Sequence, residues 1–284
     1  MPTPTMAPTP APTPAPTFAP AAWTDLGTGY FDVAAGGGQV AATRPRYNEP
    51  GKLPLGLVFA TSETIPITFG AKFDCTLANG VGVYPHHFAL GGDKLVVYTE
   101  NDHTPSLLPS VAATANNSAS AMTSSIPFLQ DMRIDGTVST DGTTVCMIAT
   151  SDVTSTKHIY CSPLHGPSNW TDLGGSDAHA LAVHGDTIYY ATPASLFQST
   201  LSDKTWTQVT TPGFQTIAFD GTRVCGTNSP GTILCTVGAL SANLTWATMP
   251  NAATGSNIWI RVALDNGLLF AVDTAQHLQV FPME

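Results

Sequence analysis

A short apolar segment that runs into a glycine-containing turn recurs along this chain, and it constrains the fold more than any other feature. The segments begin at residues 33, 88, 138, 181, 217 and 262, so successive copies lie 55, 50, 43, 36 and 45 residues apart. Each copy is followed by a second apolar run. In one copy the run 217–219 leads through an Asp-Gly turn at 220–221 to a second run at 224–225. Apolar runs joined by such turns are typical of β-hairpins. Steps of this size indicate a repeated small sheet.

The best-developed repeat contains four predicted strands. Residues 217–250 read as strand, turn, strand, turn, strand, loop, and a last strand that begins at Trp246. The copies that begin at residues 138 and 181 also end in strands led by a tryptophan, Trp170 and Trp206. Four short strands per repeat are typical of one propeller blade. We therefore predict an all-β fold, in which residues 22–284 form a six-bladed β-propeller of four-stranded antiparallel blades.

The innermost predicted strands share a small middle residue. Innermost strands converge on the axis of a propeller, where crowding favours small side chains. The six positions are Ala34, Ala89, Ser139, Ala182, Ala218 and Ala263.

The two ends of the predicted domain complement each other. The last repeat stops at residues 277–281 without a tryptophan-led strand, whereas residues 23–27 nearly copy residues 170–174. We expect the strand that begins at Trp23 to supply the missing outer strand of the last blade, which would close the ring and remove a sheet edge.

The repeat resembles that of the tectonin-type β-propellers, a group of lectin-like proteins. Residues 217–250 follow the pattern apolar–small–apolar, Asp-Gly-Thr, an apolar pair, Gly-x-Asn-Ser-x-Gly, Ile-apolar and a leading Trp. The copies at 138 and 181 match it in part, and the other three match only in the inner hairpin. The resemblance implies a propeller fold and, as one possible function, carbohydrate binding, although function does not follow from fold.

Four of the five cysteines fall into equivalent places of two repeats. Cys146 and Cys225 share one place in the second strand, and Cys161 and Cys235 share one in the third. Neighbouring antiparallel strands bring such pairs within disulfide distance. We predict the disulfides Cys146–Cys161 and Cys225–Cys235, and therefore an oxidising, extracellular location. Cys75 is left over and is interpreted as a buried free thiol.

Residues 1–21 form a separate segment rich in Pro, Thr and Ala, with a Thr-Pro-Ala-Pro repeat. Such a segment cannot bury a core and favours polyproline II, which would span roughly 60 Å over these residues. Thr beside Pro also suggests O-glycosylation. Phe18, the only aromatic residue of the tail, is the predicted anchor into a neighbouring subunit. A disordered linker is the alternative. The O-glycosylation candidates are Thr3, Thr5, Thr9, Thr13 and Thr17.

The composition restricts the partners. The chain has 10 Lys and Arg against 20 Asp and Glu, which leaves a net charge of −10, and no basic cluster. A nucleic-acid partner is therefore not expected, and no apolar run is long enough for membrane insertion. No signal peptide is recognised after Met1, so we expect a mature form or another route of export. N-glycosylation sequons occur at Asn116, Asn169 and Asn243.

We find no catalytic motif, and we expect neither enzymatic activity, nor a cofactor, nor a metal. The four Glu form no obvious acid/base pair. His86, His87 and His179 precede inner strands and could approach a metal with Asp177 or His184, but surface histidines explain the same residues and are the preferred interpretation. The outer-strand tryptophans could stack on sugars, although packing within the blade is the preferred interpretation.

Two functions remain. One is a non-enzymatic extracellular structural glycoprotein, a subunit of a fibre, sheath or cell wall that self-assembles through its N-terminal tail. The alternative is a soluble carbohydrate-binding lectin of tectonin type. We favour the structural subunit, since a free lectin does not need the Thr-Pro-Ala-Pro tail.

Overall fold

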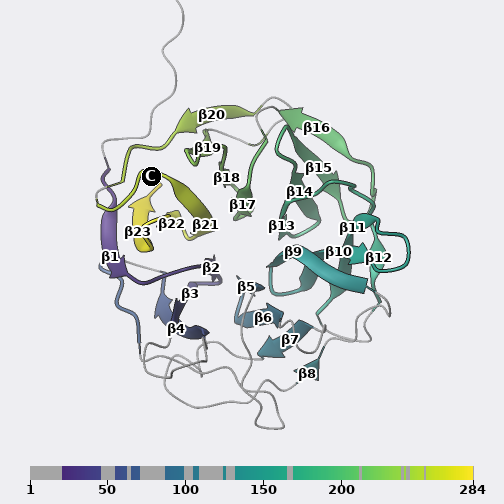
Figure 1. Ribbon diagram of the computed structural model, residues 1–284, viewed down its shortest axis with the longest axis horizontal. Helices are drawn as coiled ribbons and strands as arrows, with labels where there is room; N and C mark the ends of the chain where they lie inside the picture. Colours follow the sequence, from purple (N-terminus) through teal and green to yellow (C-terminus); the bar gives the residue numbers. More distant parts are fainter. Residues whose placement is uncertain are drawn as a thin grey trace, which may run out of the picture.

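A computed structural model shows an all-β propeller, a ring of small antiparallel sheets around a central axis (Figure 1). None of the described residues forms a helix, so none of them belongs to a helix that could cross a membrane. The structure describes residues 21–45, 55–62, 65–70, 87–98, 105–108, 124–125, 132–164, 169–210, 213–237, 240, 244–252 and 254–283.

Six sheets follow one another around the ring. The first three contain, in chain order, β2 (Val33–Gly36), β3 (Gln39–Pro45) and β4 (Leu55–Thr61); β5 (His87–Gly91), β6 (Lys94–Tyr98), β7 (Pro105–Leu108) and β8 (Ser124–Ser125); and β9 (Met132–Thr140), β10 (Thr144–Ser151), β11 (Lys157–Pro163) and β12 (Thr171–Asp172). The fourth and fifth contain β13 (Ala180–His184), β14 (Thr187–Ala191), β15 (Leu196–Thr200) and β16 (Thr207–Thr210); and β17 (Thr216–Phe219), β18 (Val224–Thr227), β19 (Ile233–Val237) and β20 (Thr245–Thr248). The last combines β1 (Thr24–Thr28) with β21 (Trp259–Asp265), β22 (Leu268–Asp273) and β23 (His277–Pro282).

The first strand of each recurring hairpin is the innermost strand of a sheet. These strands, β2, β5, β9, β13, β17 and β21, each contact the inner strands of both neighbouring sheets, so the ring is continuous. The six hairpins of the sequence therefore occupy the positions predicted for them.

The predicted number of four-stranded blades is wrong. Among the described residues, five sheets have four strands, whereas β2, β3 and β4 form a sheet of three. After β4, residues 65–70 contribute one backbone bond to it, from the Gly70 amide to the Phe59 carbonyl at 2.8 Å. Pro66 in this segment has no amide hydrogen to donate, which hinders a regular fourth ladder. The buried side chain of Ile67 nevertheless covers the sheet.

The ring closes as predicted, through β1. This strand pairs antiparallel with β23, with Thr24 opposite Val280 and Asp25 opposite Gln279. Trp23, immediately before β1, is only 5% exposed. The segment contributed by the N-terminal part of the chain thus becomes the outer strand of the C-terminal sheet. The predicted tail lies outside the described residues, apart from Ala21.

The hydrophobic core is divided among the contacts between neighbouring sheets. One cluster, for example, packs Tyr189 of β14 against Phe214 and against Val224 of β18, all of them buried. Because each sheet is apolar on both faces, its strands alternate little between buried and exposed side chains, as in β14 and β22. Burial between sheets, rather than within one central core, holds the inner strands around the axis.

Candidate functional site

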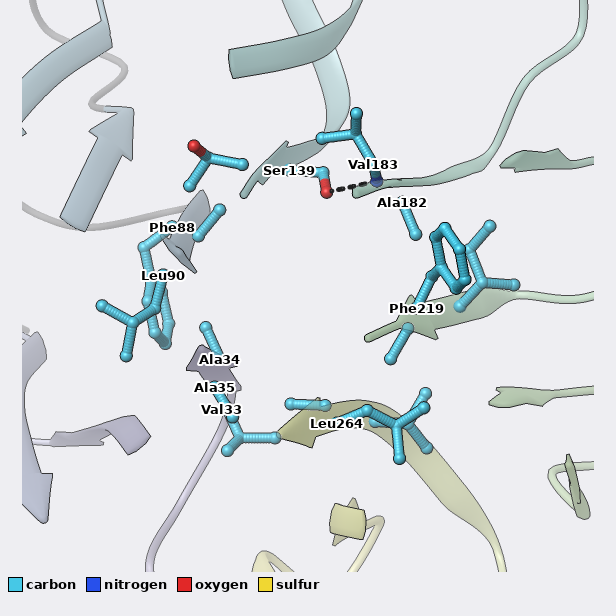
Figure 2. Close-up of a pocket in the computed structure, with 16 residues that line it drawn as sticks. Val33, Ala34, Ala35, Phe88, Leu90, Ser139, Ala182, Val183, Phe219 and Leu264 are labelled. Carbon is cyan, nitrogen blue, oxygen red and sulfur yellow. Dashed lines mark hydrogen bonds between the residues drawn. The ribbon is translucent and has the colours of Figure 1, made fainter. Parts of the chain in front are cut away.

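A concave channel runs along the ring axis through the described part of the chain, and we call it the axial channel (Figure 2). Its space of about 450 Å³, partly open to solvent, is lined by the inner strands of all six sheets. The small middle residues line it as predicted: Ala34, Ala89, Ser139, Ala182, Ala218 and Ala263. Larger side chains such as Phe88, Leu90 and Phe219 also take part in the wall. Most of the side chains that line the channel are therefore apolar.

The one hydroxyl among the small middle residues is engaged within the wall. The Val183 amide donates a hydrogen bond to the Ser139 Oγ at 3.0 Å, which joins β13 to β9 (Figure 2). This bond satisfies an amide on the free edge of an inner strand, where no further strand pairs. Ser139 therefore connects two neighbouring sheets.

Polar side chains gather where the inner hairpins turn, at one end of the channel. We call this end the axial mouth, and its lining includes, from each of the six sheets, the last residue of the inner strand or the residue that follows it. In ring order these residues are Gly36, Gly91, Asp141, His184, Asp220 and Asp265.

Asp141 holds its own turn and the next one. One carboxylate oxygen accepts hydrogen bonds from the Thr143 and Thr144 amides, both at 2.8 Å, and from the Thr143 hydroxyl. The other accepts the Gly185 amide of the neighbouring sheet at 2.9 Å. Burial acts to raise the pKa of Asp141, but these donors outweigh it and hold the pKa below the usual range for Asp.

Asp265 plays the same part between the last sheet and the first. Its side chain accepts hydrogen bonds from the Gly38 amide at 2.8 Å and from the Ser62 hydroxyl. Asp265 is 9% exposed, and this burial, together with the nearby Asp220 carboxylate, raises its pKa despite the donors. The raised pKa is the cost of enclosing a carboxylate in the connection that completes the ring.

The other turns also touch their neighbours. The His184 ring lies where a side chain on Gly221 of the next sheet would be placed, and its edge meets Phe219 with ring centroids 5.8 Å apart. Gly37 packs so closely on the Gly92 backbone that a Cβ atom would overlap it. Its φ of 61° is also a conformation that glycine adopts at little cost. Glycine and short polar residues are therefore required here by the contacts between turns.

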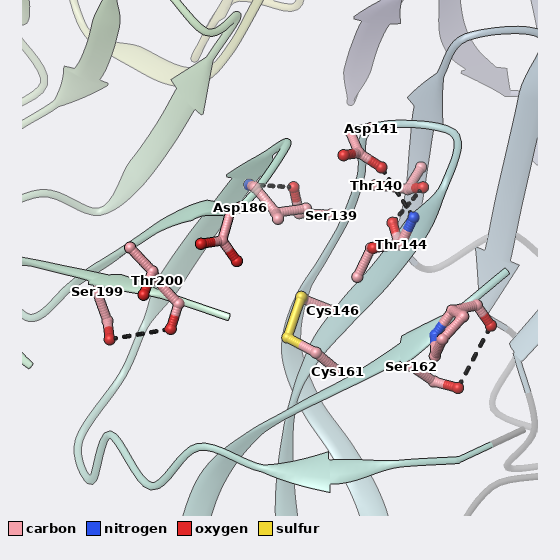
Figure 3. The surroundings of a disulfide bond; sticks show 12 residues. Ser139, Thr140, Asp141, Thr144, Cys146, Cys161, Ser162, Asp186, Ser199 and Thr200 are labelled. Atoms are coloured by element: carbon pink, nitrogen blue, oxygen red, sulfur yellow. Dashed lines mark hydrogen bonds between the residues drawn. A yellow bond between two sulfur atoms is a disulfide. The ribbon is translucent and has the colours of Figure 1, made fainter. Parts of the chain in front are cut away.

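Both predicted disulfides are present. Cys146 joins Cys161 across β10 and β11 (Figure 3), and Cys225 joins Cys235 across β18 and β19. Each pair lies directly opposite in its antiparallel ladder, with Cα atoms 4.1 Å apart. All four cysteines are buried. The two bonds are compatible with an extracellular protein.

A repeated pair was missed in the sequence, in which an Asp on an outer strand lies beside a His on the adjoining strand. The Asp25 Oδ2 of β1 lies 3.2 Å from the His277 Nδ1 of β23, and the Asp172 Oδ2 of β12 lies 2.9 Å from the His158 Nδ1 of β11. Both Asp residues belong to the copied Trp-Thr-Asp-Leu-Gly segments. Each of the two histidines stands two residues before the residue that faces the Asp, so the copies could have revealed the pairs.

The outer-strand tryptophans pack within the ring. Trp23 lies between Trp259 and Phe281, with ring centroids 4.6 and 5.3 Å away. Trp206 donates to the Leu173 carbonyl at 2.6 Å. Trp246 packs on Phe214 with ring centroids 5.0 Å apart, and Trp170 is half-buried against its sheet. These four residues are occupied by packing contacts, as the preferred interpretation held.

Other predicted positions receive only a partial description. Asn169 is exposed, and its amide donates to the Ser162 Oγ at 3.1 Å. His179 and Asp177 are exposed on the segment before β13. Among the described residues, no three His, Cys, Asp or Glu side chains form a group suited to a metal ion. The predictions for Asn116, Asn243, Cys75, His86, Phe18 and the tail threonines Thr3, Thr5, Thr9, Thr13 and Thr17 lie outside the described residues, as does the side chain of His87.

Comparison with known proteins adds no family. No family model and no curated protein matches the chain. Among solved structures, the chain is similar to apo AztD from Citrobacter koseri, with 12% identity and a TM-score of 0.48 over 89% of this chain and 70% of that one. A second structure of the same AztD gives 12% identity and a TM-score of 0.49 over 89% and 69%. The tectonin-type assignment remains a prediction.

Proposed function

We propose that this chain is a non-enzymatic extracellular structural subunit, whose N-terminal tail links neighbouring copies. The observation that carries the proposal is the place where the described chain begins. Ala21 packs at the outer edge of the last sheet beside Trp23, whose indole donates to the Pro250 carbonyl at 2.9 Å. Ala21 thus lies at the perimeter of the ring, and in our proposal the Thr-Pro-Ala-Pro segment that precedes it along the chain contacts another copy.

The described axial mouth supports a structural interpretation. Asp141 and Asp265 bond to donors in neighbouring turns, and Asp220 accepts from the Thr222 and Arg223 amides, each at 2.8 Å. Carboxylates engaged in this way stabilise the ring. They are poorly suited to acid/base chemistry, which needs a group free to exchange a proton with a substrate.

The test is deletion of residues 2–20 from the full, natively processed protein. We expect the truncated chain to keep its circular dichroism and its unfolding midpoint, but to lose the native assembly seen by light scattering and electron microscopy. Phe18→Ala should weaken assembly, and Thr17→Ala is the matched control beside it.

Two results would overturn the proposal. An unchanged assembly after the deletion would reduce the tail to a spacer. Discrete monomers that bind a glycan array without the tail would instead favour the tectonin-type lectin.

A further inference from the structure

The closure strand β1 has an unusual covalent position in the ring. It is the outer strand of the last sheet, yet the chain passes directly from it to β2, the inner strand of the first sheet. Each of the other outer strands at the end of a four-stranded sheet, such as β16 and β20, belongs to the same stretch of chain as its sheet. β1 is therefore the one outer strand of these sheets that is not joined by a loop to the strand beside it. It could dissociate from β23 while the chain through β21, β22 and β23 keeps its path.

The polar and aromatic contacts of β1 are made to the last sheet and the loop before it. Trp23 contacts Trp259, Phe281 and the Pro250 carbonyl. Asp25 accepts a hydrogen bond from the Thr254 hydroxyl at 2.9 Å and lies beside His277. The groups that contact this segment lie on residues 250–281, so an identical segment from another copy would find the same contacts.

The connection from β1 to β2 is short. It comprises residues 29–32, four residues, whereas residues 211–215 and 249–258 connect β16 to β17 and β20 to β21. Four residues span at most about 14 Å when extended, which is close to the width of three strand spacings. Gly27 and Gly29 take positive φ values of 110° and 84° beside this connection. Short, taut hinges favour exchange of a terminal strand between copies.

We propose that β1 is exchangeable, so that residues 21–28 of one copy occupy the outer-strand position on β23 of a second copy. Strand exchange remakes every contact of the closed ring and adds none, so hinge geometry and local concentration decide the balance. Within one copy the effective concentration of β1 is high, in the millimolar range for short linkers. Exchange therefore requires a high local concentration of other copies. In this respect it rests on the proposed function, in which the tails hold copies together.

An unfilled position would expose the edge of β23 and the faces of Trp259 and Phe281, which are 4% and 1% exposed in the closed ring. An unpaired strand edge of this kind recruits another strand. The position should consequently be filled at all times, by the copy's own β1 or by that of a neighbour.

Cysteine cross-linking across the β1–β23 ladder tests the exchange. Thr24 lies directly opposite Val280, so Thr24→Cys and Val280→Cys are placed on two full-length chains with different affinity tags. The mixture is concentrated, oxidised and analysed for a disulfide that joins both tags. The matched control uses Thr248→Cys and Leu234→Cys, which face each other across β20 and β19. The wild-type chain, which contains Cys75, gives the background.

We expect a mixed-tag disulfide for the Thr24 and Val280 variants and none for the control pair. The yield should rise with concentration and fall several-fold when four residues are inserted after Gly29 to relax the hinge. The double variant in one chain reports folding, since it forms its internal disulfide at low concentration only if β1 docks.

The remaining outcomes separate the two proposals. Internal disulfides at every concentration, in a protein that still assembles, would overturn the exchange and leave the proposed function standing. Absence of both the mixed disulfide and any assembly of the full chain would overturn both.

Discussion

The closure strand β1 and the outer strand β12 follow from almost the same sequence, Trp-Thr-Asp-Leu-Gly, but occupy different environments. In both, the Asp accepts the amide of the glycine two residues later, Gly27 or Gly174, and lies beside a His of the adjoining strand. However, β1 has five residues and follows a tryptophan that is 5% exposed, whereas β12 has two residues and follows the half-buried Trp170.

The difference arises from how far each strand must travel along the chain. Asp172 is 14 residues from His158, whereas Asp25 is 252 residues from His277. In an unfolded chain the longer loop costs about 2.5 kcal/mol more to close. The enclosed Trp23 and the longer ladder of β1 offset this cost. A strand that is far along the chain from its partner thus makes more stabilising contacts of its own.

The two sheets also differ in covalent support. The disulfide Cys146–Cys161 joins β10 to β11, the strand that pairs with β12. In the last sheet, the equivalent positions hold Phe270 opposite Val280. The ring is therefore closed by packing and hydrogen bonds alone. Two nearly identical local sequences are thus held in place by different interactions at two positions in one ring.

The largest difference in stability between the two strands is expected when the tryptophan before each is replaced by alanine. Trp23→Ala should lower the free energy of unfolding by about 3–5 kcal/mol, because a large buried side chain leaves a cavity beside Trp259 and Phe281. Trp170→Ala should cost less, since that side chain is only half-buried. Urea unfolding of both variants measures the difference. Equal losses would show that closure does not depend on the Trp23 pocket.

Removal of the disulfide should make the β12 sheet resemble the last sheet. Cys146→Ser with Cys161→Ser should cost about 3 kcal/mol, the entropy of a loop with a sequence separation of 15 residues. Hydrogen exchange should accelerate in residues 144–163 while β1 keeps its protection. The matched control is the second pair, Cys225→Ser with Cys235→Ser, with its effect centred on residues 224–237. Unchanged stability in either double variant would contradict the prediction.

Acid should weaken the closure strand through Asp25. Burial acts to raise its pKa, but bonds from the Gly27 amide, the Thr254 hydroxyl and His277 outweigh burial and lower the pKa. The stabilisation is therefore complete above the ordinary Asp pKa of about 4 and is lost as pH falls through the lower pKa of the folded state. Asp25→Asn should cost up to about 1 kcal/mol at pH 7 and flatten part of the acid limb.

Urea midpoints between pH 7 and 2 measure this effect. Asp141→Asn should remove a separate part of the loss of stability at acid pH, because the pKa of Asp141 is also lowered. An acid limb that is identical in the wild type and in Asp25→Asn would show that the carboxylate does not stabilise closure.

The smallest effect is expected at the copied pair of β12. The side chains of His158 and Asp172 are 33% and 47% exposed, against 20% and 29% for His277 and Asp25. Exposed pairs contribute little, so Asp172→Asn should change stability at pH 7 by less than about 0.5 kcal/mol. A loss larger than that of Asp25→Asn would reverse the comparison between the two strands.

The local pattern predicted much of the fold. The inner hairpins, the small residues of the axial channel and both disulfides follow from the recurrence of one hairpin pattern along the chain. Within a strand, successive side chains point to opposite faces, so residues at equivalent places of neighbouring strands face each other. The closing strand was predicted from the missing last strand. The prediction of a fourth strand in every sheet failed after β4, where Pro66 and the path of residues 65–70 replace a regular ladder.

The candidate site was less accessible to sequence reasoning. The hydrogen bonds that Asp141 accepts from the Gly185 amide and Asp265 from the Gly38 amide join residues 44 and 227 positions apart. Nothing in a single Asp-Gly turn distinguishes a residue that holds only its own hairpin from one that also holds its neighbour. The raised pKa of Asp265 likewise depends on burial and on the nearby Asp220 carboxylate, which lies in another sheet. The lowered pKa of Asp141, in contrast, comes mainly from the Thr143 and Thr144 donors of its own turn.

The repeated hairpin, the order of consecutive strands within a sheet and the cysteine pairing could be predicted from the sequence, since all of these depend on residues close together in the chain. The tertiary structure alone decided which turns meet at the axial mouth, how deeply Trp23 is enclosed and that one sheet keeps three strands. These features depend on contacts between sheets, whose energies come from burial and from hydrogen bonds between distant residues. For the same reason, the two copies of Trp-Thr-Asp-Leu-Gly became different strands.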